Sequence, residues 1–374
     1  PPRILARADG GTDIARLITI GTAFAGRDNR LTPIRLVLAA AVLAEHAIIV
    51  TQGPMLPPPL VINGWSLSYA AVNAFFVLSG FLIADSLERR SNPFQFAAAR
   101  MLRICPALLA LSFLAVLAIG PVVTDLSAPS YFGSLQTWSF PVQVLGFLDT
   151  SQGPAGIFSD NTWAGEFSAT LLTLRYEVLA YAGAALIFFS PLPWGRGAKL
   201  FLFVGVTAAY LVVRSFWPDA PAMIESGLRL ASAFTLGMLV HVWREKIPVL
   251  PWPTLIVLPV WIALGSHPLA EVFLNLTLAS ILFAVAFAGL GRWPTGARLP
   301  DWSYGIYIWH YPVMQVVLYW YPAADPLEVA IYSIPVTLLI SAASWSWIEK
   351  PSLAGKAGLG RWLELAFKGM RPSP

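Results

Sequence analysis

Ionisable side chains lie inside apolar stretches of this sequence, where charge is costly and usually serves a function. Arg35 and His46 lie in the first such stretch, eleven residues apart. On a helix this spacing returns to within about 20° of the starting face and rises roughly 16 Å, so the two side chains share one stripe. Because imidazole titrates near neutral pH, His46 is a candidate general base in a channel. The alternative is an anchoring arginine and a histidine hydrogen-bonded inside a helix bundle.

Glu177 and His310 are further candidates of this kind. Glu177 lies well inside an apolar stretch and needs a polar partner there. A structural ion pair would satisfy it without any function, whereas a polar cavity would give it a role at a site. His310 lies in the aromatic-rich stretch 303–312, which suits either an aromatic belt or a packed wall.

Two arginines and a serine complete the set of candidates. Arg100 and Arg103 are three residues apart and would share a helix face, so their guanidinium groups can hold phosphate oxygens bidentately. Considered alone, anchoring to anionic lipid is the favoured explanation of these two arginines. Ser79 precedes Gly80, and such small pairs let membrane helices approach closely, which indicates packing more than chemistry.

The composition indicates which elements must position these residues. Hydrophobic residues make up 57% of the chain and charged residues 12%, about half the charged share of a soluble domain. The spare apolar surface must therefore face lipid. The net charge of +4 comes without the aromatic and basic interleaving that binds single strands, so no nucleic-acid partner is expected. The single cysteine, Cys105, excludes a disulfide framework and a cysteine-based zinc site, and no metal is expected.

A membrane-spanning helix needs about 20 mostly apolar residues. The segments of this kind are 34–50, 66–86, 104–124, 167–190, 198–216, 226–243, 253–267, 271–290, 303–321 and 328–348. The sequence therefore predicts an all-α protein, a polytopic membrane helix bundle of about ten transmembrane helices. The weakest segment is 253–267, which is short and interrupted by Pro259.

The loops between these segments predict the orientation, because Lys and Arg accumulate in cytoplasmic loops. With the N-terminus inside, the inside loops contain Arg89, Arg90, Arg100, Arg103, Arg196, Lys199, Arg244, Lys246, Arg292, Arg298, Lys350, Lys356, Arg361, Lys368 and Arg371. The outside loops 51–65, 125–166, 268–270 and 322–327 contain no Lys or Arg. Both termini are therefore expected in the cytoplasm.

This topology divides the chain and gives two segments a side. We expect a cytoplasmic segment at 1–30, a membrane domain at 31–351, and a cytoplasmic tail at 352–374 that is amphipathic or disordered. The loop 125–166 faces outward and is either a binding loop or an ordinary connection. Three arginines lie near outer helix ends, against the general trend, and favour a polar cavity on that side: Arg175, Arg214 and Arg229.

Six segments, in order from about Thr32 to Pro351, resemble the acyltransferase family 3 of membrane O-acyltransferases. That family acetylates bacterial lipopolysaccharide O-antigen, exopolysaccharide and Nod factors. The matching segments are Arg35 with His46, Phe75–Phe81, Arg100–Arg103, Thr173–Tyr181, Ser303–Pro312 and Glu349–Pro351. Two positions depart from the family pattern: Asn73 stands where Asp is usual, and Tyr176 precedes a single acid at Glu177 where two acids are common.

The resemblance implies an acyltransferase of the bacterial inner membrane, with acetyl-CoA as donor substrate. The acceptor is expected to be a hydroxyl of a polysaccharide or lipid-linked glycan on the outer side. Arg100 and Arg103 would hold the CoA phosphates, with Ser79 and His310 also assigned to the donor site. Arg35 would position the donor, His46 would act as base or acyl carrier, and Glu177 would orient the histidine or the sugar.

Two functions of other classes also fit buried charges in about ten spans. A transporter or flippase for a lipid-linked glycan predicts an inverted repeat between the two halves, and the sequence shows none. A membrane scaffold without catalytic activity gives His46 and Glu177 no purpose. Release of free CoA from labelled acetyl-CoA separates the enzyme from both alternatives.

Overall fold

The computed structural model describes residues 18–25, 29–53, 61–90, 92–191, 195–287 and 299–369. They belong to two compact units. The first unit contains residues 1–38, 61–88 and 180–300, and the second contains 39–60, 89–179 and 301–374. Most of the expected N-terminal segment 1–30 lies outside the described residues.

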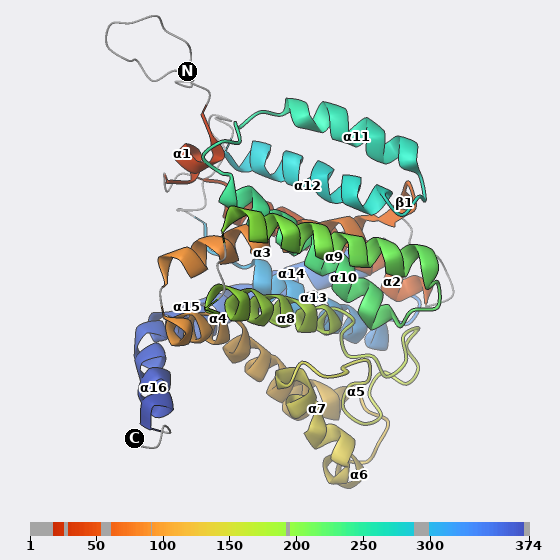
Figure 1. The fold of residues 1–374 in the computed structure, drawn as a ribbon. Coiled ribbons are helices and arrows are strands. Elements are labelled where there is room, and N and C mark those ends of the chain that lie inside the picture. The colour runs from red at the N-terminus through yellow and green to blue at the C-terminus, as the bar shows by residue number, and fades with distance from the viewer. Residues whose placement is uncertain are drawn as a thin grey trace, which may run out of the picture. The chain divides into compact units, whose positions relative to one another are not determined.

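Each of the ten predicted spans is a helix in the structure (Figure 1). These helices are α2 (Leu31–Gln52), α3 (Leu67–Arg89), α4 (Pro93–Leu114), α8 (Leu171–Phe188), α9 (Arg196–Phe216), α10 (Ala222–Val242), α11 (Trp252–Leu264), α12 (Ala270–Phe287), α13 (Ser303–Trp320) and α14 (Pro326–Ser344). The shorter elements are α1 (Ile20–Ala25), β1 (Val61–Ile62), β2 (Trp65–Ser66), α6 (Ala128–Gly133), α7 (Leu135–Leu145) and α16 (Lys356–Gly369). Single π-helical turns, η1 (Ala115–Ile119) and η2 (Trp345–Glu349), continue α4 into α5 (Gly120–Val123) and α14 into α15 (Lys350–Ala354).

In the described ranges, 8 helices are long and apolar enough to cross a membrane. The fold class is therefore the predicted one, but the count of about ten is not confirmed by length and composition. The helix α11 has 13 residues and rises only about 20 Å, less than the thickness of the hydrocarbon core. The helix α13 has 18 residues, but its tyrosine, tryptophan and histidine side chains make it less apolar.

The third span begins earlier than the hydropathy predicts. Asn92 caps α4 by accepting a hydrogen bond from the backbone N–H of Phe94, and Pro93 occupies the first turn, where no N–H is needed. Arg100 and Arg103 therefore lie inside a helix. Their shared face follows from helical geometry, as the sequence predicted.

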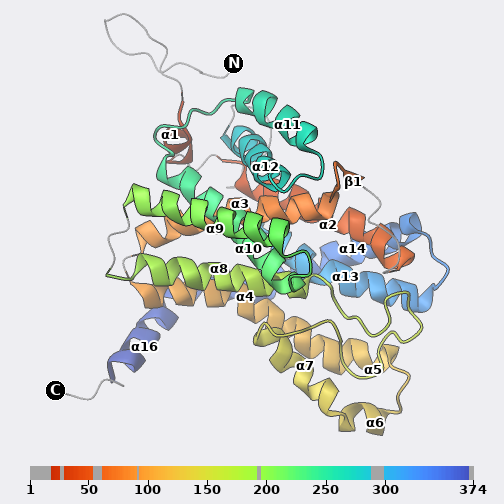
Figure 2. The same cartoon turned by 45° about the vertical axis from the view of Figure 1, so that its right-hand side comes forward.

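The predicted loop 125–166 is a folded segment with two short helices, α6 and α7, which follow α5 in Figure 2. Tyr131 donates a hydrogen bond of 2.9 Å to the carbonyl oxygen of Val116, and its side chain is fully buried. Thr124 donates one to the carbonyl of Ala155, 2.9 Å away. These contacts hold the start of the segment against η1 and bring Ala155 back beside Thr124.

In the first unit, α3 and α10 cross at two glycines. A Cβ added at Gly80 would overlap the carbonyl oxygen of Phe234, and one at Gly237 would overlap that of Val77. Small residues at such a crossing let the two backbones touch. The close approach of helices that the sequence predicted at Ser79–Gly80 is therefore observed.

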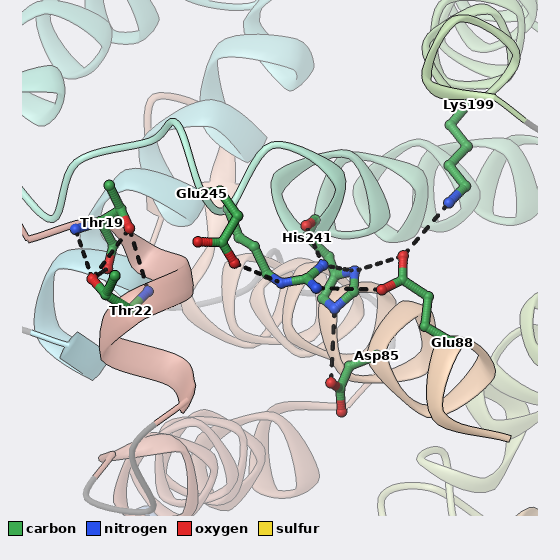
Figure 3. Close-up of polar contacts among 8 residues, drawn as sticks. Thr19, Thr22, Asp85, Glu88, Lys199, His241 and Glu245 are labelled. Atoms are coloured by element: carbon green, nitrogen blue, oxygen red, sulfur yellow. Dashed lines mark hydrogen bonds and ion pairs between the residues drawn. The ribbon is translucent and has the colours of Figure 1, made fainter.

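The far ends of α3 and α10 are joined by charge. Glu88 lies 3.4 Å from Arg244 Nη2 and 3.9 Å from Lys199 Nζ. The buried His241 ring has Asp85 and Glu88 carboxylate oxygens each 3.8 Å from its nitrogens (Figure 3). Later residues of α3 thus contact later residues at and beyond the end of α10, so the two helices run in the same direction.

The helix α12 runs in this direction too, and α11 runs against it. Asn73 pairs with Asn275, and the Phe81 ring lies 4.9 Å from that of Phe283, so positions along α3 and α12 increase together. Thr254 near the start of α11 bonds Ser280 near the end of α12, at 2.8 Å. Figure 1 shows these two helices side by side.

In the second unit, the expected C-terminal tail contributes a packed helix. On α16, Gly360 contacts Gln95 of α4, Glu364 accepts a 2.7 Å hydrogen bond from Asn92, and the Phe367 ring lies 5.2 Å from that of Phe94. The part of the tail that the structure describes is thus ordered and amphipathic, and it packs on the start of α4.

Replacing Gly80 with Ala should separate α3 from α10, because the new methyl group meets backbone that cannot rotate away. We expect a loss of roughly 1–3 kcal/mol of stability, as for other overpacked sites, measured as a lower melting temperature in detergent. Gly205→Ala on α9 is the matched control, since nothing lies within 4 Å of a Cβ there. Equal melting of the two variants would contradict the crossing.

Candidate active site

His46 and His310 form a hydrogen-bonded pair in the second unit. His46 lies on α2 and His310 on α13, and His46 Nδ1 is 2.8 Å from His310 Nε2. The rings lie nearly parallel, with centroids 5.1 Å apart. His310 is fully buried, whereas His46 is half-buried. The sequence placed these two histidines in separate roles, but the structure brings them together.

The backbone determines which nitrogens carry protons. His310 Nδ1 is 2.8 Å from the carbonyl oxygen of Ile306, which can only accept, so Nδ1 must be the protonated nitrogen. In a neutral ring His310 Nε2 is then an acceptor, and His46 Nδ1 must donate to it. A neutral His46 therefore keeps its lone pair on Nε2. This arrangement is that of an oriented general base, in which one ring fixes the tautomer of the other.

The folded segment before α8 reaches the same part of α13. Tyr311 packs its ring edge-on against His46, with centroids 5.6 Å apart, and donates a 3.2 Å hydrogen bond to Glu166. The buried Gln315 donates to the carbonyl oxygens of Trp163 and Glu166, at 2.9 and 2.7 Å. Trp163 in turn donates to the carbonyl of Ile49 on α2, at 2.9 Å. The segment thus connects both helices that carry the histidine pair.

Glu166 lies outside the predicted spanning segments and is half-buried. Burial raises the pKa of its carboxyl group from 4.5 to about 7, against the opposing effect of the Tyr311 hydrogen bond. A carboxyl group that titrates near neutral pH can exchange protons under working conditions.

Glu177 lies further along α8. Thr170 donates to the Tyr307 carbonyl at 3.1 Å, and Thr173 hydrogen-bonds the Tyr307 hydroxyl. Because Glu166 meets Gln315 while Thr173 meets Tyr307, α8 and α13 are antiparallel. Glu177, one turn after Thr173 on the same face, therefore lies toward the start of α13. Along α13, Glu166 is the carboxylate nearer to the histidine pair.

Arg103 is held by two carboxylates. Its Nη2 is 2.6 Å from Asp301 and its Nη1 is 3.3 Å from Glu349, which is almost fully buried. The guanidinium carbon lies 5.7 Å from the ring centroids of Tyr304 and of Trp345. Arg103 therefore joins α4 to the start of α13 and the end of α14. Glu349, in the last of the segments that resemble the family, thus pairs with an arginine of α4.

The other predicted site residues have these positions. Arg100 lies on α4 in the second unit, with its guanidinium carbon 6.0 Å from the Phe96 ring centroid. Arg35 lies on the part of α2 that belongs to the first unit, and Ser79 lies in the first unit beside the glycine crossing. Among the described residues, no group of three or more His, Cys, Asp and Glu side chains could hold a metal ion.

Sequence reasoning missed Glu166, Tyr311, Gln315 and Asp301. Tyr311 and Gln315 follow His310 in α13, and a polar glutamine four residues beyond Tyr311 was a usable signal. Glu166 carried no such signal, because it lies in a segment that hydropathy assigns to a loop.

These features define the class: a multi-pass membrane protein with a hydrogen-bonded histidine pair where a folded segment meets its helices. A family model described as an acyltransferase domain matches residues 29–345. The chain belongs to this family, and the predicted membership of acyltransferase family 3 is confirmed.

Three curated relatives align with this chain over at least nine tenths of their own length. The O-acetyl transferase of Shigella phage Sf6 is 26% identical over 337 residues, covering 87% of this chain and 96% of the relative. Nodulation protein 10 of Rhizobium leguminosarum bv. viciae is 25% identical, covering 89% and 95%. The exopolysaccharide production protein ExoZ of Rhizobium meliloti is 26% identical, covering 77% and 90%. No solved structure matches the chain significantly.

Replacing Glu166 with Gln should change how stability depends on pH. Since the folded-state pKa is raised, the stability linked to this group is present below its ordinary pKa of 4.5 and is lost as the pH rises through about 7. From pH 5 to pH 8 the wild type should lose roughly 1–3 kcal/mol relative to Glu166→Gln, measured by melting temperature.

Asp160→Asn is the matched control, because Asp160 is an exposed carboxyl in the same segment. It should follow the wild-type pH profile. A Glu166→Gln profile that also follows the wild type would exclude a proton held at this position.

Proposed function

We propose that this protein is a membrane O-acyltransferase, in the first instance an O-acetyltransferase. It moves the acyl group of acyl-CoA, with acetyl-CoA as donor substrate, to a hydroxyl of a cell-surface or exported carbohydrate. The acyltransferase family supports the reaction class. The names of the relatives, an O-acetyl transferase, a nodulation protein and an exopolysaccharide production protein, support a glycan acceptor.

The observation that carries the proposal is the hydrogen-bonded pair of His46 and His310. His46 Nε2 removes the proton of the acceptor hydroxyl as its oxygen attacks the thioester carbonyl. The C–S bond breaks, and the imidazolium returns the proton to the leaving thiolate, so that free CoA and an ester are formed. His310 accepts the Nδ1 hydrogen bond throughout and stabilises the imidazolium, because its Nε2 lone pair faces it.

Donor and acceptor are proposed to enter from opposite sides. The basic loops favour a cytoplasmic location for both termini and for the start of α4, in a bacterial inner membrane. Arg100 lies there and would contact the CoA phosphates, while Arg35, on the same helix as His46, would position the donor. Arg103 would shape this region through its two ion pairs, and Glu166 and Tyr311 would face the acceptor.

The transporter or flippase alternative predicted buried charges without a base. An oriented histidine lone pair and membership of an acyltransferase family favour the enzyme. The two remain separable by experiment, because only the enzyme consumes acyl-CoA.

Replacing His46 with Ala should abolish acyl transfer, because no other group supplies the base at this position. The assay mixes purified protein with labelled acetyl-CoA and a glycan acceptor, and it measures free CoA and labelled glycan. Expression should remain near the wild type, and stability should fall by only about 1–3 kcal/mol, because the buried His310 Nε2 loses its hydrogen-bond partner. Full activity in His46→Ala would exclude the assigned base.

Arg100→Gln should raise the KM for acyl-CoA by roughly tenfold or more, the value of a lost charged hydrogen bond. Arg103→Gln should instead lower stability by up to about 3–5 kcal/mol, because it removes the cation that pairs with the buried Glu349 carboxylate. Donor KM and melting temperature are measured for both variants. An unchanged donor KM in Arg100→Gln would exclude its contact with the CoA phosphates.

A further inference from the structure

A second polar cluster lies in the first unit, and the mechanism above does not use it. It joins the beginnings of α3, α10 and α12 and consists of Trp65, Tyr69, Asn73, Arg229 and Glu271. Polar groups at membrane depth are costly and usually serve a site or a structural contact. The hydrogen bonds of the cluster show which members are committed to structure and which face a ligand.

Glu271 is committed to structure. Its Oε2 accepts hydrogen bonds from the Trp65 indole N–H at 2.8 Å and from the Tyr69 hydroxyl at 2.9 Å. Its Oε1 accepts from the Asn73 amide, and the side chain is 1% exposed. The Asn275 amide also donates to Oε1, at 3.5 Å. These four donors occupy the four acceptor positions of the carboxylate, which leaves no capacity for a ligand. It holds the two aromatic rings in fixed positions.

The amide at position 73 explains one departure from the family pattern. Asn73 donates to Glu271 and to Asn275, and its oxygen accepts from Arg229 Nη1. An aspartate here would place a second carboxylate against Glu271 and would pair with Arg229. The asparagine leaves Arg229 with a neutral partner.

Arg229 is therefore the member with binding capacity. Its guanidinium carbon lies over the Tyr69 ring, 3.8 Å from the ring centroid, which is a close cation–π contact. In the ranges that the structure describes, no carboxylate oxygen lies within 4.0 Å of it. Arg214, by contrast, has Glu225 at 3.7 Å. Arg229 is half-buried, and none of its nitrogens is both buried and without a hydrogen-bond partner.

We propose that Arg229 binds an oxyanion of the glycan acceptor, a phosphate or a carboxylate, with Tyr69 and Trp65 as aromatic walls. A planar guanidinium matches both anions bidentately, and the half-buried Trp65 ring lies edge-on beside the Tyr69 ring, with centroids 6.4 Å apart. The segments that precede α3 and α12 contain no Lys or Arg, which favours the outer side, where the acceptor is expected. The inference rests on the proposed function for its choice of acceptor.

The test measures binding alone, so it does not depend on acyl transfer. Purified full-length protein in phosphatidylcholine nanodiscs is titrated with glucose, glucose 1-phosphate and glucuronic acid, and saturation-transfer NMR gives each Kd. The variants are Arg229→Gln, which retains a donor to Asn73, and Arg229→Lys, which retains the charge. Arg214→Gln is the matched control, an arginine at a neighbouring helix end that already has a carboxylate partner.

At least one anionic sugar should bind the wild type and Arg214→Gln roughly 10- to 100-fold more tightly than glucose does. Arg229→Gln should lose this preference, and Arg229→Lys should keep part of it. Equal binding of all three sugars, or a preference that survives in Arg229→Gln, overturns the proposal.

Lipid is tested as the other source of a phosphate. If phosphatidylglycerol nanodiscs abolish anionic-sugar binding in the wild type, a lipid headgroup occupies the site and the acceptor assignment is wrong. Binding that persists there supports it. A protein that binds anionic sugars but releases no CoA would refute the proposed function and leave this site standing.

Discussion

The hydrogen bond between His46 and His310 joins positions 264 residues apart in the sequence. In hydrocarbon each such group needs an internal partner, since no water replaces a lost hydrogen bond. The same requirement brings Arg103 to Asp301 and Glu349 in the second unit, and brings Trp65, Tyr69 and Asn73 to Glu271 in the first. These polar contacts act together with close packing, as at Gly80 and Gly237, to hold distant helices against one another.

Hydropathy predicted the helices α2 to α4 and α8 to α14 among the described residues, because the bilayer restricts the length and composition of a span. The polar residues of interest were also visible, because charge is rare in such segments. Their partners were not. Arg103 and His310 were each assigned to the donor site. The sequence did not show that Asp301 and Glu349 lie beside Arg103, or that His310 faces His46. Pairing depends on contacts between distant segments, which spacing along one helix does not contain.

The segment between α5 and α8 shows how an apparent loop contributes to a membrane site. Buried Tyr131 fixes one end of it, and Gln315 binds the backbone at Trp163 and Glu166 near the other. The sequence could indicate its length and lack of basic residues, but not that Glu166 would meet Tyr311 beside the histidines. Hydrogen bonds to carbonyl groups hold it, and main-chain atoms leave no signature in a sequence.

The common direction of α3, α10 and α12 restricts how many times the chain can cross the bilayer between them. Two helices that traverse a bilayer in the same direction must be separated by an odd number of traverses. In the sequence, α3 and α10 are separated by three long apolar helices: α4 with its continuation, α8 and α9. This odd number satisfies the rule. Only α11 lies between α10 and α12 as a helix, so the short, proline-containing α11 and its flanking turns must return the chain to the level from which α10 began.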